Sequence, residues 1–217
     1  MDFMRLIKSL EEFLYEIMVW LIFYPRTLWW AVTQPNRLME YADKELEDAD
    51  EDRYSDTLSP PIFLALTLLI VHFFEKASPA GKSLTGFMAD DEKLLAVRII
   101  SFSMFPLIQS FRLLRLQKIP LDRKTLKAPF FGQCFIAAPF ALGVDIGAVI
   151  GSGNNSIATA IALTLMIVTT IWYLVIQSIW FSDKLGVSRA RGAGHAAITF
   201  FEAVIICSFI GAGVSYL

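Results

Sequence analysis

The sequence has few of the residues from which catalytic and metal sites are built. It contains only two histidines and two cysteines among 217 residues. It has no Glu-x-x-His pair, nucleophile elbow, phosphate-binding loop or Cys/His constellation. Cys134 and Cys207 both lie inside apolar runs, where cysteine behaves as a small hydrophobe and a disulfide framework has no purpose. We therefore expect no enzyme activity, no cofactor and no metal ion.

Charge is also scarce. Asp, Glu, Lys and Arg make up 18% of the chain, and the formal net charge is −2. The basic residues lie at the ends of apolar runs instead of forming a stripe, so nothing indicates nucleic-acid binding. By contrast, 55% of the residues are hydrophobic and the mean hydropathy is +0.54. This composition is typical of a protein exposed to lipid, and the bilayer is the first partner that we expect.

Five apolar segments are long enough to cross a membrane. A hydrocarbon core about 30 Å thick needs about 20 residues in helix. The segments are 59–75, 92–114, 128–151, 156–181 and 194–217. The short GSGNN link between the third and fourth makes these two antiparallel neighbours. The predicted fold class is an all-α, polytopic transmembrane helical bundle of five spans, forming a domain 59–217 behind an N-terminal region 1–58.

The basic residues of the connecting loops predict the orientation. Lys and Arg resist translocation and mark the cytoplasmic side of a membrane protein. Five of them follow the second span, at Arg115, Lys118, Arg123, Lys124 and Lys127, and three follow the fourth, at Lys184, Arg189 and Arg191. The GSGNN link has none. The N-terminus is therefore expected in the cytoplasm and the C-terminus outside.

The N-terminal region has two parts of different character. Apolar residues recur at helical spacing over 3–32, and the aromatic residues that anchor helices at the headgroup level are Trp20, Tyr24, Trp29 and Trp30. This pattern predicts an amphipathic helix lying in the membrane interface. The alternative, a sixth span over 13–32, would bury Glu16 and Arg26 in hydrocarbon. The acidic stretch 40–56 is expected to be a solvated linker.

Ionisable residues within spans are candidates for function because each is costly to bury. Arg98 and Asp145 are each about six residues from the predicted outer ends of their spans, a depth of about 9 Å. They could therefore meet, and His72 could join them. A structural ion pair is the favoured interpretation of this outer cluster, and a proton or ion relay is the alternative.

A second polar layer is expected toward the cytoplasmic end. It consists of Gln109, Gln133 and Gln177, with Glu202 deeper in the last span. Interhelical hydrogen bonds of this kind hold bundles together, and this is the favoured role. In the alternative, a carboxylate surrounded by amides takes up protons or accepts a polar substrate group.

Glycines recur at intervals of four in the third span. Gly143, Gly147 and Gly151 form a tandem of the small-xxx-small pattern, which lets two helix backbones approach closely. The partner is either the fourth span, through Ala158 and Ala162, or another protomer.

The order of these elements is similar to that of a known family. An N-terminal region containing FYPRTLWWAVTQPNRLMEYA, followed by five spans and almost no C-terminal tail, resembles the Yip1 family and its bacterial relatives. The similarity covers most of the chain as a layout, with a local likeness at 25–35. It implies a five-span protein of the bacterial inner membrane. The family's Asp-Leu-Tyr-Gly-Pro signature is absent, so no functional residue is carried over.

Two functions fit these features. The first is a non-enzymatic membrane organiser or accessory subunit that assembles with itself or with other membrane proteins. The second is a small transporter or channel whose polar layers line a path. A dry outer cluster of His72, Arg98 and Asp145 favours the first function, and a water-filled route between the two layers favours the second.

Overall fold

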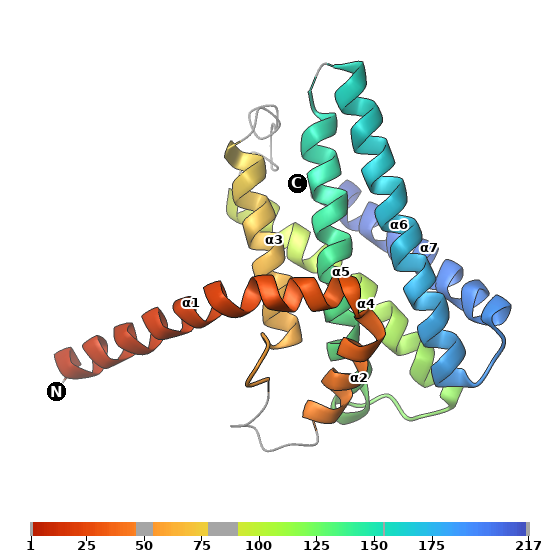
Figure 1. Ribbon diagram of the computed structural model, residues 1–217, viewed down its shortest axis with the longest axis horizontal. Helices are drawn as coiled ribbons and strands as arrows, with labels where there is room; N and C mark the ends of the chain where they lie inside the picture. The colour runs from red at the N-terminus through yellow and green to blue at the C-terminus, as the bar shows by residue number, and fades with distance from the viewer. Residues whose placement is uncertain (1, 47–53, 78–90, 154, 216–217) are drawn as a thin grey trace.

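The computed structural model describes residues 2–46, 54–77, 91–153 and 155–215, and this part of the chain is helical without any strand (Figure 1). Its helices are α1 (Asp2–Thr33), α2 (Pro35–Glu45), α3 (Pro60–Ala77), α4 (Asp91–Gln117), α5 (Arg123–Gly151), α6 (Ser156–Leu185) and α7 (Arg189–Ser215). The predicted all-α fold class is confirmed.

Helices α3 to α7 are each long and apolar enough to cross a membrane, which confirms the five predicted spans. The protein is therefore an integral membrane protein. Several helices extend beyond the predicted limits. Their additional turns consist mainly of polar residues, which a search for apolar segments leaves out. The start of α5 shows this, where the Asp122 carboxylate accepts hydrogen bonds from the backbone amides of Lys124 (2.7 Å) and Thr125 (2.8 Å). These bonds lower the pKa of Asp122, because they stabilise its charged form.

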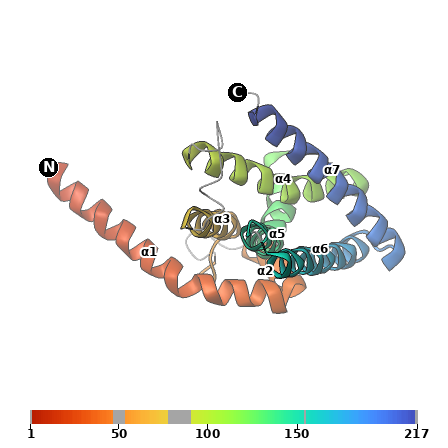
Figure 2. The same cartoon turned by 90° about the horizontal axis from the view of Figure 1, so that it is seen from above.

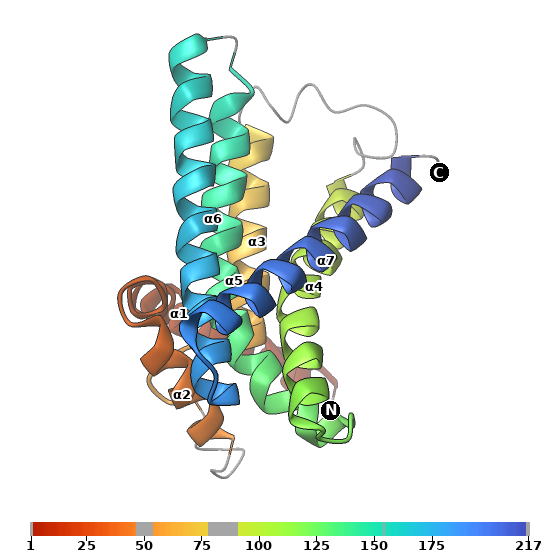
Figure 3. The ribbon, with the colours of Figure 1, turned by 90° about the vertical axis from the view of Figure 1, so that its right-hand side faces the viewer.

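Helix α5 is the centre of the bundle. It packs against α3, α4 and α6, and also against α2 (Figures 1 and 3). Every residue from 132 to 141 is buried, including Pro139. The other spans are arranged around this buried segment, so α5 positions the polar side chains that the bundle encloses.

Helix α1 lies across the bundle instead of alongside the spans (Figures 1 and 2). The chain then turns into α2, which packs against α5 near the end where α5 begins. An ion pair joins α2 to the end of α6, with Asp43 Oδ2 2.6 Å from Lys184 Nζ. Both N-terminal helices therefore meet the bundle at the end that carries loops 118–122 and 186–188.

The expectation of a solvated linker over 40–56 is wrong for 40–45 and for Tyr54. Residues 40–45 belong to α2, and 47–53 lie outside the described residues. Met39 and Ala42 are buried, and so are Tyr54 and Leu58. Apolar residues at helical spacing place the acidic side chains on the outer face of a packed helix. One core cluster includes these residues together with those of the spans, so the N-terminal region packs against the bundle.

Candidate functional site: buried polar layers and an exposed helix

Arg98 of α4 lies between two carboxylates that come from neighbouring helices. Its Nε atom is 3.5 Å from Asp145 Oδ2 of α5, and its Nη2 atom donates to Glu75 Oε2 of α3. The three side chains are largely buried. The predicted contact between Arg98 and Asp145 is confirmed. Glu75 completes the outer ion-pair cluster. The sequence does not single it out, because it lies at the end of the apolar run 59–75.

His72 does not complete this cluster in the expected way. Its side chain is buried, and its Nδ1 atom has no hydrogen-bond partner among the described residues. It lies one turn before Glu75 on α3, yet no ion pair or hydrogen bond joins it to Arg98 or Asp145 in the described part of the chain. The outer cluster therefore ties α3, α4 and α5 together through Arg98, without the imidazole as a link.

The amides of the inner layer form hydrogen bonds with partners inside the bundle. Gln133 and Gln177 bond reciprocally, with N···O distances of 2.9 and 2.5 Å, and thereby join α5 to α6. Gln109 donates to the Tyr173 hydroxyl at 3.3 Å and accepts from Thr199 Oγ1 at 2.7 Å. All five side chains are fully buried. These bonds connect α4 with α6 and α7, which is the structural role favoured from the sequence.

Glu202 is not part of this layer, contrary to the prediction. Its carboxylate lies 3.3 Å from Arg112 Nη1, and 47% of the side chain is exposed. Thr199 and Ala203 are buried on α7. Residue 202 precedes Ala203 and is turned by about 100° from it around the helix axis, away from the core. The inner layer therefore contains three amides and no carboxylate.

An aromatic cluster fills the centre of the bundle. It consists of Phe105, Phe140, Tyr173 and Phe200, one residue from each of α4 to α7. The ring centroids of Phe140 and Tyr173 are 4.5 Å apart, and those of Phe105 and Phe140 are 5.2 Å apart. Phe200 lies 5.9 Å from Phe105. Rings at these distances are in direct packing contact.

The position of this cluster along two helices is informative. On α4, residue 105 falls between Arg98 and Gln109, and on α5, residue 140 falls between Gln133 and Asp145. The aromatic cluster therefore separates the outer ion-pair cluster from the inner amide layer with packed rings.

The glycine series of α5 faces α6 within the same chain, which decides between the two predicted partners. A Cβ atom on Gly143 would overlap the Thr169 side chain, and one on Gly147 would lie 2.5 Å from Met166 Cγ. A Cβ on Gly151 would lie 3.2 Å from Ala162 Cβ. Small residues are thus required where the two helices approach most closely.

Gly192 of α7 has the same role against α6. A Cβ atom at this position would overlap the Ser178 carbonyl oxygen and lie 3.0 Å from the Ser182 backbone nitrogen. The only signal in the sequence is the pair of small residues Gly192 and Ala196 at an interval of four, which is weaker than the glycine series of α5. Gly211 and Gly213, farther along α7, have no atom within 4 Å of such a Cβ.

The second half of α1 is anchored to the bundle. The Tyr24 hydroxyl donates to Thr67 Oγ1 of α3 at 3.2 Å, and its ring lies 5.4 Å from that of Phe63. Burial raises the pKa of Tyr24. Thr27 is fully buried and accepts a hydrogen bond from the Leu58 backbone amide at 3.2 Å. This part of α1 therefore has a fixed position on α3.

The four predicted interfacial anchors are not equivalent. Trp29 is 67% exposed, whereas Trp20, Tyr24 and Trp30 are partly buried against the core. The Arg26 guanidinium lies over the Trp30 ring, 4.5 Å from its centroid. Three of the aromatic residues thus help to attach α1 to the bundle, and one is left on the surface.

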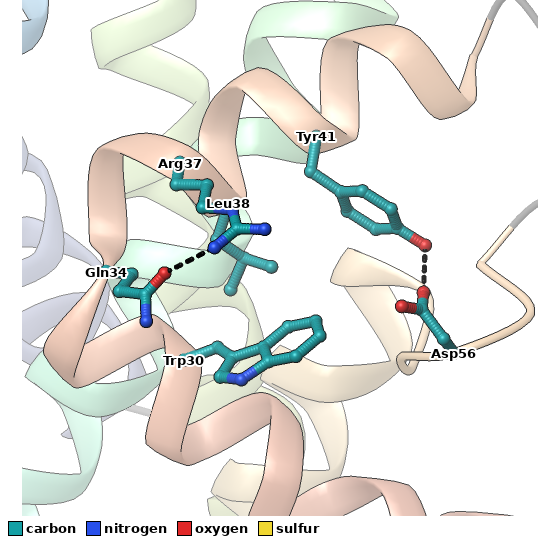
Figure 4. Close-up of a pocket in the computed structure, with 6 residues that line it drawn as sticks. All are labelled: Trp30, Gln34, Arg37, Leu38, Tyr41 and Asp56. Carbon is teal, nitrogen blue, oxygen red and sulfur yellow. Dashed lines mark hydrogen bonds between the residues drawn. The ribbon is translucent and has the colours of Figure 1, made fainter.

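A small cavity lies where α1, α2 and the segment before α3 meet (Figure 4). Arg37 donates to Gln34 Oε1 at 3.0 Å, and the Tyr41 hydroxyl donates to Asp56 Oδ1 at 2.5 Å. Burial and the neighbouring Asp56 carboxylate raise the pKa of Tyr41. The volume of about 100 Å³ is below the range of about 300–1,000 Å³ typical of ligand pockets. The Tyr41–Asp56 bond joins α2 to the segment that leads into α3.

The first half of α1 extends beyond the bundle, and its contact with the core begins at Trp20 (Figures 1 and 2). We call residues 4–22 the N-terminal arm. Its exposed large apolar side chains are Met4, Ile7, Leu10, Phe13, Leu14, Tyr15, Ile17, Met18, Leu21 and Ile22. Most of them share one side of the helix, and four of the charged residues lie on the other side, where Lys8 and Glu12 pair at 3.9 Å. The described residues provide no partner for this apolar face.

No family model matches this chain, and no curated protein or solved structure is significantly similar to it. The likeness to the Yip1 family therefore stays a prediction.

Proposed function

We propose that this protein is a non-enzymatic membrane organiser, whose N-terminal arm lies on the membrane surface and supports assembly with further copies or with other membrane subunits. The observation that carries this proposal is the exposed apolar face of the arm. Soluble surfaces seldom expose contiguous apolar patches of more than a few hundred Å², and larger patches mark interaction sites. An amphipathic helix held across a set of spans has the geometry of a helix in the interface plane.

The second half of α1 supports the same arrangement. The exposed apolar residues continue along the helix to Trp29 and Val32, while Thr27 and Ala31 face the bundle. One side of α1 is thus fixed to protein and another side stays apolar and exposed. A lipid surface beside the spans would cover this second side along the whole helix.

The interior of the bundle supports an organiser over a transporter. The outer ion-pair cluster and the inner amide layer are separated by the packed rings of the aromatic cluster. Gln109, Gln133 and Gln177 are all hydrogen-bonded to groups of this chain. A path for a polar substrate would require the rings to separate and these bonds to break.

The proposed location is a bacterial inner membrane with the N-terminus in the cytoplasm. Helices α1 and α2 meet the bundle at the end with the basic loops, which is the cytoplasmic end by the positive-inside rule. In a variant without native cysteines, Ser188→Cys should react with an impermeant maleimide only from the cytoplasm, and Ser152→Cys only from outside. Both positions are exposed. The reverse pattern would refute the orientation.

The assembly role is tested with two substitutions on the apolar face of the arm. Leu10→Gln with Leu14→Gln keeps the net charge and the helix propensity while removing two exposed apolar side chains. The matched control, Lys8→Gln with Glu12→Gln, changes two residues of the polar face and also keeps the net charge. We expect cross-linked assemblies in native membranes to be lost in the first variant and kept in the control. Equal assembly in both variants would refute the role of the apolar face.

A further inference from the structure

A groove between α4 and α7 lies near the end of α4 that faces the basic loops. Its volume is about 590 Å³, within the range of ligand pockets. Arg112, Arg115 and Glu202 supply its charged groups, and the apolar part of its lining includes Ile108, Phe111 and Ile206. The helices cross obliquely at this level (Figure 3), and packing contacts hold them together.

The groove has more positive than negative groups in its lining. Arg112 Nη1 contacts Glu202 Oε1 at 3.3 Å, while Arg112 Nε is buried without a hydrogen-bond partner among the described residues. Arg115 is exposed. Two guanidinium groups therefore accompany a single carboxylate in the lining, which leaves an excess of one positive charge and an unused donor.

The charged and apolar groups are ordered along the membrane normal. Helix α4 ends at Gln117, so Arg115 and Arg112 lie within about 8 Å of its end, close to the depth of the headgroup region. Helix α4 runs toward this end and α7 runs away from it. Ile108 and Ile206 therefore both lie on the side of the charges nearer the membrane centre.

We propose that this groove binds one anionic phospholipid. The phosphate pairs with Arg112 and Arg115, whose planar guanidinium groups suit its oxygens, and an acyl chain lies against Ile108, Phe111 and Ile206. Phe111 and Ile206 are 44% and 39% exposed, so a chain can reach them. Charge selects the lipid, since a zwitterionic headgroup brings a cation into a site that already has an excess of arginine. This site is independent of the N-terminal arm.

The test is lipid binding to the full-length protein, measured by native mass spectrometry during titration with phosphatidylglycerol or phosphatidylcholine. We expect wild type to prefer phosphatidylglycerol. Arg112→Gln with Arg115→Gln should weaken its binding about 30-fold, or about 2 kcal/mol, because each basic residue near a membrane surface contributes about half of this. The matched control is Arg123→Gln with Lys124→Gln, which removes two exposed basic residues near the same end. Equal losses in the two variants would overturn the proposal.

Two further variants keep the arginines and test the groove itself. Glu202→Gln removes the competing carboxylate and should tighten phosphatidylglycerol binding several-fold, whereas Ile206→Trp should weaken it by filling the apolar part. An excess of inorganic phosphate should leave the bound lipid in place. Unchanged binding in both variants, or displacement of the lipid by phosphate, would overturn the assignment of a phospholipid to this groove.

Discussion

The bundle and the N-terminal arm differ in how their unfavourably placed side chains are accommodated. Most buried polar side chains of the bundle are paired within the chain, whereas exposed apolar groups of the arm have no partner among the described residues. In the bundle, the Arg98 guanidinium contacts the Asp145 carboxylate, and the amides of Gln133 and Gln177 bond to one another. In the arm, large apolar side chains such as Leu10 and Leu14 are more than half exposed. Contacts within the chain can therefore stabilise the bundle. The apolar face of the arm would be stabilised by burial against lipid or another protein. Changes in the bundle should alter stability, and changes in the arm should alter association.

The largest effect on the free energy of unfolding should come from the outer ion-pair cluster. Asp145→Asn leaves a buried arginine with one fewer carboxylate and should destabilise the protein by about 1–4 kcal/mol. The measurement is a double-mutant cycle with Arg98→Gln, read by thermal unfolding in nanodiscs. Because the two groups are in contact, the double variant should lose less than the sum of the single losses. Strict additivity would show that the pair is not coupled. Glu202→Gln is the control for a half-exposed pair and should cost about 0–1 kcal/mol.

The contact between α6 and α7 should be almost as sensitive. Gly192→Ala forces a methyl group against the backbone of α6 and should cost about 1–3 kcal/mol through overpacking. Gly194→Ala, two residues along the same helix, has open space around its new methyl group and should be neutral or stabilise by about 0.5–1 kcal/mol. The measurement is the difference between the melting temperatures of the two variants, which reports the cost of the added methyl group where α7 packs against α6. Equal values would mean that α7 is not held against α6 at Gly192.

A smaller effect is expected from the reciprocal amide pair. Gln177→Leu leaves the buried Gln133 amide without its partner and should cost about 1–2 kcal/mol. Replacing both glutamines with leucine removes both unsatisfied groups, so the double variant should be more stable than either single variant. Unfolding of the three variants in the same detergent makes the comparison. A double variant less stable than both single variants would contradict a purely structural pair.

The smallest effect on stability should come from the arm. Leu10→Gln with Leu14→Gln changes two exposed side chains and should shift the free energy of unfolding by less than about 0.5 kcal/mol. Its effect should appear in assembly instead. A loss of stability as large as that of Asp145→Asn would mean that the arm packs on the bundle and would remove the contrast between the two regions.

Part of this structure could be predicted from the sequence, because an ionisable or very small residue within an apolar span is easily recognised. An ionisable group such as Arg98 stands out within an apolar run, and its depth indicated Asp145 as its partner. A regular spacing, as in the glycines of α5, indicated a close helix contact. These features depend only on position along one helix.

The features that were missed depend on rotation about a helix axis or on tertiary contacts. Glu202 lies at a suitable depth for the inner layer, but it is turned toward Arg112 at the surface. Helix α2 was hidden because its acidic residues dominate the composition, although Met39 and Ala42 bury one side. Gly192 is important only because Ser178 of α6 lies against it. Hydropathy does not carry this information, and the spacing of small residues does not identify the residue that packs against them.

The most direct test of the proposed function is the depth of the arm in a bilayer. Spin labels at Leu14→Cys and Glu12→Cys, in full-length protein without native cysteines in nanodiscs, would report collisions with oxygen, which concentrates in lipid, and with a water-soluble nickel complex. The interface arrangement predicts that the label at 14 collides mainly with oxygen and the label at 12 mainly with nickel. Two labels equally accessible to nickel would place the arm in water, two labels equally accessible to oxygen would place it within the bilayer, and either result would contradict the account.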